Sequence, residues 1–355
     1  MEHVSRQSGN GRTVVLAVSQ NPGAALGHDT PDTDFRRLAE LTGGEVVGNT
    51  GFASPIPLLR RFEKATALDL SQAMQVLKRY PDADVYVSFS ERVGIPLGMM
   101  LAGRRRRPAH IVIAHRLNTG PKRWITKFTR WQKGVDRLVT LCSAQHAHAV
   151  RLVGDRAVMV RAGVTDNRYY FATGEEEDYV LSVGNESRDY DVLVAAASSA
   201  SLPVKVVSSS PWCRRKVSAR KSAGCIEFLP RVGYSVLREL YQKARLIAVP
   251  LRDVDYAAGH NAVCEAFCVN KPLIVSSSRG IMDYVSHLTN SYVVPVRNTD
   301  AMTAALTSVY TDSSIRETLI RGAEAAVTEY AGLDVYAVRL ESLISGVGRE
   351  NTQWL

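Results

Sequence analysis

A glycine turn followed by a short apolar segment holds the residues best suited to chemistry. The residues Gly-His-Asn at 259–261 come after an apolar run at 244–251 and open a segment with a single acid, Glu265. This pattern is typical of a strand that passes into a helix. Backbone N–H groups in the first turn of a helix have no partner inside the helix and attract anions. Glu265 follows about one turn later and can accept hydrogen bonds from sugar hydroxyl groups. The segment therefore predicts a site for a diphosphate that carries a sugar.

The rest of the chain alternates between strand and helix patterns. In the first half, strands are expected at 13–19, 45–48, 84–89, 110–115, 137–141 and 157–160, and helices at 34–41, 68–79, 93–102, 122–133 and 144–153. An acidic segment at 174–178 is a candidate hinge, after which the pattern restarts. Further strands are expected at 179–183, 204–208 and 226–229, and further helices at 190–197, 236–243, 299–309, 314–330 and 334–343. Such alternation predicts an α/β fold with doubly wound parallel sheets.

Length and composition fit a folded protein of two domains. The chain has 355 residues, of which 45% are apolar and 22% are charged, and this is ordinary for globular domains. The N-terminus lacks the apolar core of a secretory signal, and no run reaches the roughly 18 apolar residues of a membrane span. We therefore expect residence in the cytosol. The five cysteines include no zinc-type pair, and a metal role for Cys264, Cys268 and His260 lacks a fourth ligand.

Three common classes of enzyme lack their motifs here. The loops that follow the strands at 13–19 and 179–183 do not carry the GxGxxG pattern of dinucleotide-binding enzymes. No GxxxxGK[ST] loop for nucleoside triphosphates is present. A GxSxG nucleophile elbow is also missing. The sequence therefore does not favour a dinucleotide-binding enzyme, a P-loop enzyme or a hydrolase with a nucleophile elbow.

Several segments of the second half resemble the family 4 retaining glycosyltransferases of the GT-B fold, which belong to the glycosyl transferases group 1. Val-Leu-Ser-Val-Gly at 180–184 resembles the strand that opens the donor-binding domain, and Glu-Phe-Leu-Pro-Arg-Val-Gly-Tyr at 227–234 resembles the lining of the base pocket. Glu-Ala-Phe-Cys-Val-Asn-Lys-Pro at 265–272 resembles the family's glutamate motif. The resemblance implies two Rossmann-like domains that face a cleft, residues 1–173 and 174–330, with a helix at 331–355 that returns to the first.

The resemblance also implies roles for individual residues. Arg188 takes the place of the lysine that contacts the donor diphosphate, Glu265 matches the acid that holds the ribose, and His115 matches an active-site histidine at a strand end. Two positions depart from the family pattern, because Asn185 stands for an arginine and Ala257 for an acid that faces the donor sugar. The expected donor-binding residues are Gly184, Asn185, Arg188, Gly259, His260, Asn261, Ala262 and Glu265, the expected catalytic residues are His115, Arg188 and Glu265, and the acceptor side is expected at Asn21, Gly23, Gly27 and His28. The family needs no metal ion or other cofactor.

The positive charge of the chain is concentrated in its first half. Residues 1–172 carry 25 Lys and Arg against 14 Asp and Glu, and residues 104–137 carry 11 basic residues and one acid, Asp136. Trp124, Phe128 and Trp131 fall on one helical stripe within this segment and are expected to pack into the core of their own domain. The cations would attract an anionic membrane surface, at about 1 kcal/mol per basic residue, or a phosphorylated acceptor. Nucleic acid is not expected, since no aromatic-interleaved binding module is visible.

These observations predict a retaining, metal-independent hexosyltransferase. It would move a sugar from a nucleotide diphosphate sugar to a lipid-linked or polysaccharide acceptor, in the cytosol and at the inner membrane face. One alternative is transfer to a small soluble metabolite. The other is a non-catalytic protein that binds nucleotide sugars, an interpretation that the residues at 185 and 257 keep open.

Overall fold

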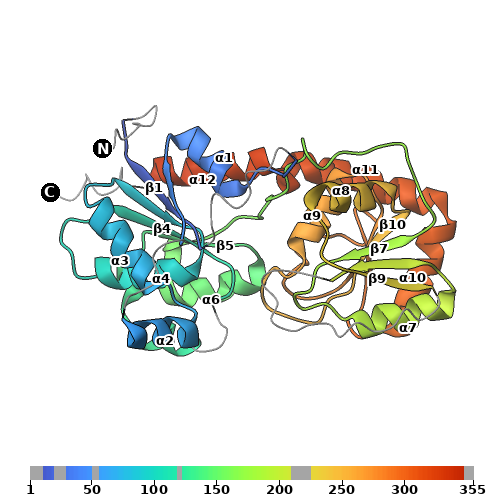
Figure 1. Cartoon of the computed structure of the whole chain (residues 1–355), viewed down its shortest axis with the longest axis horizontal. Helices are drawn as coiled ribbons and strands as arrows, with labels where there is room; N and C mark the ends of the chain where they lie inside the picture. Colours follow the sequence, from blue (N-terminus) through green and yellow to red (C-terminus); the bar gives the residue numbers. More distant parts are fainter. Residues whose placement is uncertain (1–10, 20–28, 50–55, 118–121, 209–224, 348–355) are drawn as a thin grey trace. The chain divides into compact units, whose positions relative to one another are not determined.

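The computed structural model describes residues 11–19, 29–49, 56–117, 122–208 and 225–347 (Figure 1). Contacts divide the chain into two units. The first unit comprises residues 1–27, 34–160 and 337–355, and the second comprises residues 28–33 and 161–336. Each unit has its own parallel sheet of six strands. The fold class is therefore α/β with two doubly wound sheets, as the alternation of strand and helix patterns predicts.

The sheet of the first unit has the strand order β2-β1-β3-β4-β5-β6, and every neighbouring pair is parallel. Its strands read as short apolar runs because helices cover both faces of the sheet. All four residues of β1 and of β3 are buried. The strands are β1 (Val14–Ala17), β2 (Glu45–Val47), β3 (Val85–Ser88), β4 (Ala109–Ala114), β5 (Arg137–Thr140) and β6 (Ala157–Met159).

Helices cover the two faces of this first sheet. On the face that α4 covers, Val93 and Leu97 of this helix belong to one core cluster, and its Ile95 packs with Trp131 in the cluster beside it. No helix in the described ranges is both long and apolar enough to span a bilayer. The helices of the unit are α1 (Asp34–Thr42), α2 (Pro57–Thr66), α3 (Leu70–Arg79), α4 (Glu91–Leu101), α5 (Lys122–Phe128), α6 (Ser143–Val153), and two 3-10 turns, Trp131–Gly134 and Gly154–Arg156.

The sheet of the second unit has the order β12-β11-β10-β7-β8-β9 and is also parallel throughout. The chain starts at the centre with β7, builds outward to β9, and then returns to the centre with β10. The strand order thus reverses between β7 and β10, which makes this the point where doubly wound folds place their ligands. The strands are β7 (Val180–Val183), β8 (Val204–Val207), β9 (Ile226–Leu229), β10 (Leu246–Val249), β11 (Leu273–Ser276) and β12 (Tyr292–Val294).

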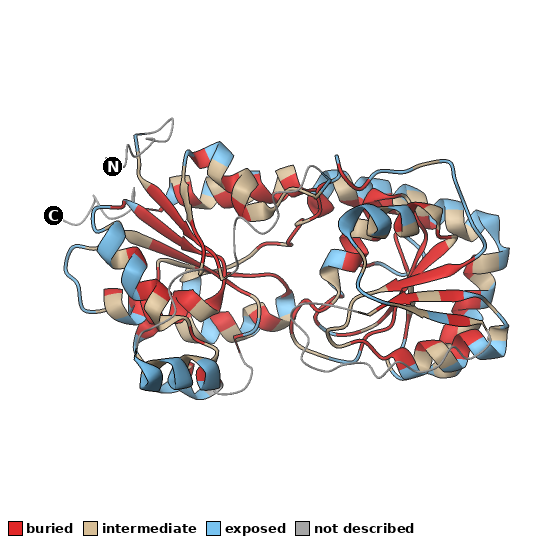
Figure 2. Cartoon of the chain, in the orientation of Figure 1, coloured by how far each residue is buried: buried red, intermediate tan, exposed pale blue. Residues whose placement is uncertain are grey.

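Helices α7 and α10 pack on one face of the second sheet, while α8 and α9 lie on the other (Figure 1). The core between the sheet and the first pair contains Leu193 of α7 and Leu306 of α10. Figure 2 shows the central strands of both sheets largely in the colour of buried residues. The helices are α7 (Tyr190–Ala200), α8 (Tyr234–Lys243), α9 (His260–Cys268), α10 (Thr299–Thr311), α11 (Ser313–Ala326), a π-helical turn (Val327–Ala331) and α12 (Leu333–Gly346).

The N-terminal part of the first unit runs to Val160, whereas the sequence places the boundary at residue 173. Residues 161–173 pack within the second unit, and Tyr170 is the clearest example because its buried ring meets Tyr241 edge-on at 6.0 Å. The Ala162 N–H also donates to the hydroxyl of Tyr284 at 2.8 Å. The acidic segment at 174–178 therefore lies inside the second unit. Sequence periodicity does not reveal this, because the packed residues form no helix or strand of their own.

The last helix belongs to both units. α12 begins in the second unit, where the Leu333 N–H donates to Thr165 O at 3.0 Å, and from residue 337 it is part of the first. Its C-terminal end is held by Arg12, whose Nη1 donates to the carbonyl of Ile344 at 3.2 Å and to that of Val347 at 3.0 Å. The chain therefore passes from the second unit back to the first within a continuous helix.

The structure differs from the sequence-based expectation at two helices. α2 was not expected, because almost all of its side chains are exposed and its apolar residues do not follow the pattern of a buried face. The helix expected at 122–133 ends at Phe128, and a 3-10 turn follows at 131–134. This break changes the helical phase, so that Trp131 and Val135 are fully buried while Trp124 and Phe128 are exposed. The prediction of one buried aromatic stripe is therefore wrong.

Two glycines allow α4 and the 3-10 turn to touch through their backbones. A Cβ atom at Gly134 would lie 2.1 Å from the carbonyl oxygen of Gly98 in α4, and one at Gly98 would lie 2.8 Å from Trp131 O. Both neighbours are backbone atoms that cannot rotate away. This contact seats the indole of Trp131, the largest fully buried side chain of the described residues.

We expect Gly134→Ala to lower the free energy of unfolding by about 1–3 kcal/mol, the usual effect of overpacking a well-packed interior. Gly103→Ala is the matched control, because a Cβ atom there meets nothing within 4 Å, and it should stay within about 1 kcal/mol of wild type. Urea unfolding followed by circular dichroism measures both. Equal stability of the two variants would show that the helix and the turn are not in this close contact.

Candidate active site in the second unit

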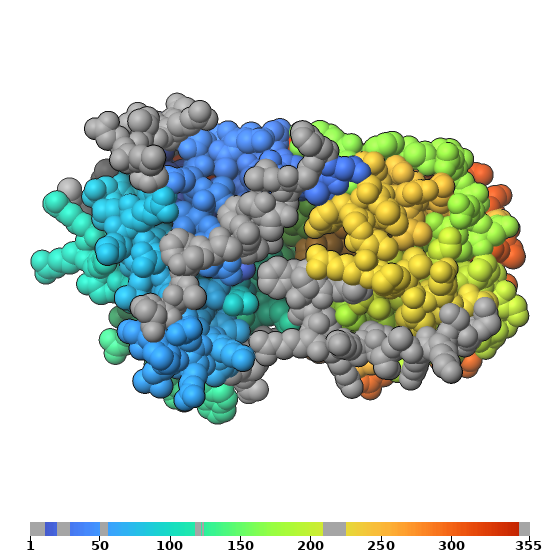
Figure 3. Space-filling view, viewed as in Figure 1, coloured from blue at the N-terminus to red at the C-terminus, as the bar shows by residue number. Residues whose placement is uncertain are grey.

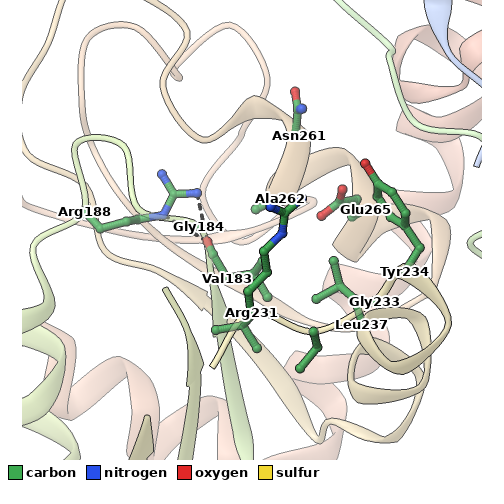
Figure 4. Close-up of a pocket in the computed structure, with 12 residues that line it drawn as sticks. Val183, Gly184, Arg188, Arg231, Gly233, Tyr234, Leu237, Asn261, Ala262 and Glu265 are labelled. Carbon is green, nitrogen blue, oxygen red and sulfur yellow. Dashed lines mark hydrogen bonds between the residues drawn. The ribbon is translucent and has the colours of Figure 1, made fainter. Parts of the chain in front are cut away.

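One pocket of about 490 Å³ lies at the carboxyl ends of the central strands of the second unit (Figure 4). The end of β8 and the segments that follow β7, β9 and β10 contribute to it. It therefore occupies the point where the strand order reverses. Figure 4 shows Arg188 on one side of the pocket, Glu265 and Tyr234 on the other, and Arg231 between them. The lining residues are Val183, Gly184, Arg188, Val207, Arg231, Val232, Gly233, Tyr234, Leu237, Asn261, Ala262 and Glu265.

The guanidinium of Arg188 is fixed by backbone carbonyl groups. Its Nε and Nη2 donate to Val183 O at 3.1 and 2.9 Å, and its Nη1 donates to Glu186 O at 3.0 Å. No carboxylate pairs with it among the residues that the structure describes. An arginine has five N–H donors, so two remain for a ligand. A buried, oriented cation of this kind is suited to hold a phosphate group.

Two glycines with positive φ make room for this guanidinium. Gly184 has φ +100° and Gly259 has φ +87°, a conformation that side chains rarely adopt. A Cβ atom on Gly184 would lie 2.6 Å from Arg188 Nη2, and one on Gly259 would lie 3.2 Å from Nη1. Gly184 follows β7 and Gly259 follows β10. The two central strands thus end in turns that are shaped around one cation.

The first turn of α9 offers backbone N–H groups to the same pocket. Gly259 is the residue before the helix and gives no side-chain cap, so the amides of Asn261 and Ala262 have no partner within the helix. Both residues line the pocket. The helix dipole adds partial positive charge at this end. Together with Arg188, it makes one wall of the pocket favourable for an anion.

Glu265 lies on the opposite side and is paired with a buried tyrosine. The hydroxyl of Tyr241 donates to its Oε2 at 2.6 Å. Burial raises the pKa of Glu265 to about 7, although the Tyr241 hydrogen bond and the charge of Arg188 act in the opposite direction. Burial and the nearby Glu265 charge also raise the pKa of Tyr241 well above its ordinary value. The tyrosine therefore acts as a donor that fixes one carboxylate oxygen and leaves the other to the pocket.

Seven lining residues are not among the individual site residues expected from sequence, and the largest of them are Arg231, Tyr234 and Leu237. The segment 227–234 was assigned to a base pocket as a whole, but nothing in its pattern shows which side chains turn inward. Figure 4 shows Arg231 directed toward Ala262. It has no hydrogen-bond or ion-pair partner within the described part of the chain. The pocket thus contains a second cation opposite the N-terminus of α9.

The structure brings together five of the eight residues expected to bind the donor. Asn185, Gly259 and His260 do not line the pocket. The ring of His260 turns back, and its Nδ1 lies 2.6 Å from the carbonyl oxygen of Ala257. Ala257, which stands where the family pattern has an acid, is buried. The lining residues of that set are Gly184, Arg188, Asn261, Ala262 and Glu265.

His115 belongs to the first unit, at the end of β4. Its N–H donates to Glu91 Oε2 at 2.9 Å, and its Nε2 lies 3.1 Å from Phe89 O. Glu91 forms a buried ion pair with Lys122. Burial alone would raise the pKa of Glu91, but Lys122 and His115 outweigh it and lower the pKa to about 2. His115 is thus oriented by a charged carboxylate. The expected acceptor residues Asn21, Gly23, Gly27 and His28 lie outside the described residues.

The cysteines do not form a metal site in the part of the chain that is described. Cys264 and Cys268 are buried and unpaired by disulfides, and burial raises the pKa of both thiols. No group of three His, Cys, Asp or Glu side chains that could hold a metal ion is found within the described ranges.

Part of the second unit matches the model of a known family. Residues 177–312 match the model of the family described as glycosyl transferases group 1. No curated protein matches the sequence significantly. The family match covers β7 to α10 and therefore includes every element that lines the pocket.

Solved structures of glycosyltransferases share the fold over nearly the whole chain. Sucrose-phosphate synthase from Thermosynechococcus elongatus is similar with a TM-score of 0.69 and 15% identity, over 94% of this chain and 98% of that one. HepE from Anabaena, in complex with UDP-glucose, gives 0.68 and 12%, over 94% and 100%. WaaG, a glycosyltransferase involved in lipopolysaccharide biosynthesis, gives 0.61 and 16%, over 95% and 100%. The two parallel sheets with flanking helices are the GT-B fold that these glycosyltransferases share.

The raised pKa of Glu265 predicts a change of stability with pH. The folded protein holds the proton more tightly than the unfolded chain, whose pKa is the ordinary 4.5, and the folded value is about 7. This carboxyl group therefore lowers the free energy of unfolding as pH rises from about 4.5 to 7. The Glu265→Gln variant, which does not titrate, should gain stability relative to wild type over that window.

Urea unfolding at several pH values measures the difference between variant and wild type. Glu317→Gln, at an exposed position of α11, is the control and should show a flat difference. A flat difference for Glu265→Gln as well would mean that the carboxyl group is not desolvated in the folded protein.

Proposed function

We propose that this protein is a retaining, metal-independent glycosyltransferase whose second unit holds a nucleoside diphosphate sugar. One observation carries the proposal: a single pocket brings together Arg188, the amides at the start of α9 and Glu265. The first two suit the diphosphate of such a donor, and the carboxyl group of Glu265 suits its ribose. The family match over residues 177–312 supports this assignment, and HepE, which shares the fold, was crystallised with UDP-glucose.

In the proposed complex, the diphosphate lies against Arg188 and the first turn of α9. When the bond between the anomeric carbon and the phosphate oxygen breaks, the leaving diphosphate gains negative charge. The guanidinium is already oriented by Val183 O and Glu186 O, so no reorganisation is needed as the charge develops. The sugar carbon gains positive character at the same time, and the acceptor hydroxyl attacks it from the face that the diphosphate leaves, with its proton passing to the departing phosphate oxygen. This path retains the configuration and needs no metal ion.

The remaining lining residues fit the nucleoside. Glu265 would accept hydrogen bonds from the ribose hydroxyls through the oxygen that Tyr241 leaves open. Val207, Leu237 and the ring of Tyr234 offer apolar surface for a base. His115 in the first unit would orient the transferred sugar. For the acceptor we propose a lipid-linked sugar or a polysaccharide, which the role of WaaG in lipopolysaccharide biosynthesis supports.

Two substitutions should separate the phosphate site from the ribose site. Arg188→Gln should weaken UDP binding roughly 10- to 100-fold, because a hydrogen bond to a charged group contributes about 1.5–3 kcal/mol, and should leave uridine binding nearly unchanged. Glu265→Ala should weaken both ligands by a similar factor, since both contain ribose. Isothermal titration calorimetry with UDP, GDP, ADP and uridine measures these affinities.

Arg252→Gln is the control for the first substitution, because Arg252 is an exposed arginine nearby that does not line the pocket. It should bind UDP as wild type does. A Glu265→Ala variant with unchanged affinity for every nucleotide would refute the assignment of the ribose site.

The enzyme can be distinguished from a non-catalytic binding protein, the alternative that Ala257 favours. The wild type should release UDP or another nucleoside diphosphate from its donor sugar, with or without an acceptor, and EDTA should not change the rate. The Arg188→Gln variant should be slower by roughly 10²- to 10³-fold, as when an enzyme loses one stabilising donor. Product NMR should show the anomeric configuration of the donor. Donor binding without release above the Arg188→Gln background would favour the binding protein.

A further inference from the structure

The first unit exposes large apolar side chains on two short helices. In α2, Leu58 is 75% and Phe62 is 46% exposed, and in α5, Trp124 is 61% and Phe128 is 72% exposed. The neighbouring Ile56 adds a fifth exposed apolar side chain. Exposure of large apolar side chains to water is unfavourable. Large exposed apolar patches therefore mark interaction sites. Figure 2 shows α2 almost entirely in the colour of exposed residues.

The exposed residues of α2 follow the repeat of a helix that rests on a surface. Leu58, Phe62 and Ala65 recur after four and three residues and form one exposed stripe. A second stripe, Leu59, Glu63 and Thr66, is turned inward. The apolar stripe of the helix is thus on its exposed side, next to an inward stripe with a single apolar residue. Figure 3 shows this part of the chain, in blue at the lower left, open to the viewer.

The charges beside these apolar residues are positive. Arg60, Arg61 and Lys64 of α2 are exposed. The single acid of this helix, Glu63, is turned toward α3, where its Oε1 accepts a hydrogen bond from the Ser71 N–H at 2.6 Å. The surface of α2 therefore presents three cations, and its carboxylate is used elsewhere.

α5 repeats the combination of aromatic rings and cations. The rings of Trp124 and Phe128 stack in parallel, with centroids 5.9 Å apart, and Lys127 Nζ lies 5.7 Å from the Phe128 ring. The helix contains no acid. Leu68, two residues beyond α2, and Ile125 of α5 pack in the same core cluster, so the two helices are anchored at one place in the unit.

We infer that α2 and α5 form a docking surface for a membrane with anionic lipids. Leucine and aromatic side chains beside Lys and Arg are the pattern of helices that lie in the lipid interface. The side chains of Leu58, Phe62, Trp124 and Phe128 would enter the acyl boundary, and the cations would meet lipid phosphates. Each basic residue near such a surface increases affinity about five-fold. The inference does not depend on the pocket of the second unit, but it fits a lipid-linked acceptor.

Part of the basic segment at 104–137 does not belong to this docking surface. Arg107 forms an ion pair with Asp136, with Nη1 and Oδ2 2.6 Å apart, and Lys122 pairs with Glu91. Those two cations therefore have a structural role. The exposed aromatic pair of α5 and the whole of α2 supply the surface in their place.

Co-sedimentation with vesicles tests the proposal. The full-length wild type should bind phosphatidylglycerol-containing vesicles at low salt, at least ten-fold more weakly at high salt, and not measurably bind pure phosphatidylcholine. Leu58→Ser/Phe62→Ser and Trp124→Ala/Phe128→Ala should each reduce binding to the anionic vesicles at least ten-fold. Met74→Ser/Val150→Ser is the matched control, because both residues are exposed apolar side chains of the same unit, and it should bind as wild type does.

Three results would overturn the proposal. They are failure of the wild type to bind anionic vesicles at low salt, equal loss of binding in the control, and a dimer in solution that the Leu58→Ser/Phe62→Ser variant dissociates, since the face would then belong to a second copy of the chain. Calorimetry with UDP serves as the folding control. All variants should keep wild-type affinity for it, so a failure of membrane binding leaves the proposed function intact.

Discussion

The fixed position of one guanidinium organises the second unit. Arg188 is held by carbonyl groups of the loop after β7, and it fits only because two turns, at Gly184 and Gly259, adopt backbone conformations that keep side chains away. Those turns end the two strands between which the sheet reverses its order. The position of the cation is therefore a property of the fold itself. The same reversal places the start of α9 in the pocket that Arg188 lines. It also places Glu265 there, whose carboxylate accepts a hydrogen bond from Tyr241.

Two buried glutamates have different pKa values because their partners differ. Glu91 is buried beside a lysine and stays charged, with a pKa lowered to about 2. Glu265 is paired with a neutral tyrosine, and its pKa rises to about 7. The first carboxylate serves as a structural anchor that orients the His115 backbone. The second can respond to its surroundings, because a ligand that donates hydrogen bonds favours the charged form.

The sequence predicts the alternation of strands and helices well, because buried parallel strands read as apolar runs and the glycine turn marks the main site. It predicts Arg188 and Glu265 only through resemblance to a family, since a single Arg or Glu in a loop or helix has no distinctive pattern. It does not predict α2, whose apolar residues face outward, nor the break after Phe128 that separates Trp124 from Trp131. It also does not reveal the pairing of Tyr170 with Tyr241, which depends on contacts between distant segments.

The path of α12 has a consequence for synthesis of the protein. The first unit needs residues 337–347, because Arg12 near the start of the chain is bonded to carbonyl groups of Ile344 and Val347. The ribosome makes these residues after the whole second unit. The sheet that begins the chain must therefore wait, with one face incomplete, while the whole second unit emerges and folds. Nascent chains that stall before the final helix would expose that face to chaperones and proteases.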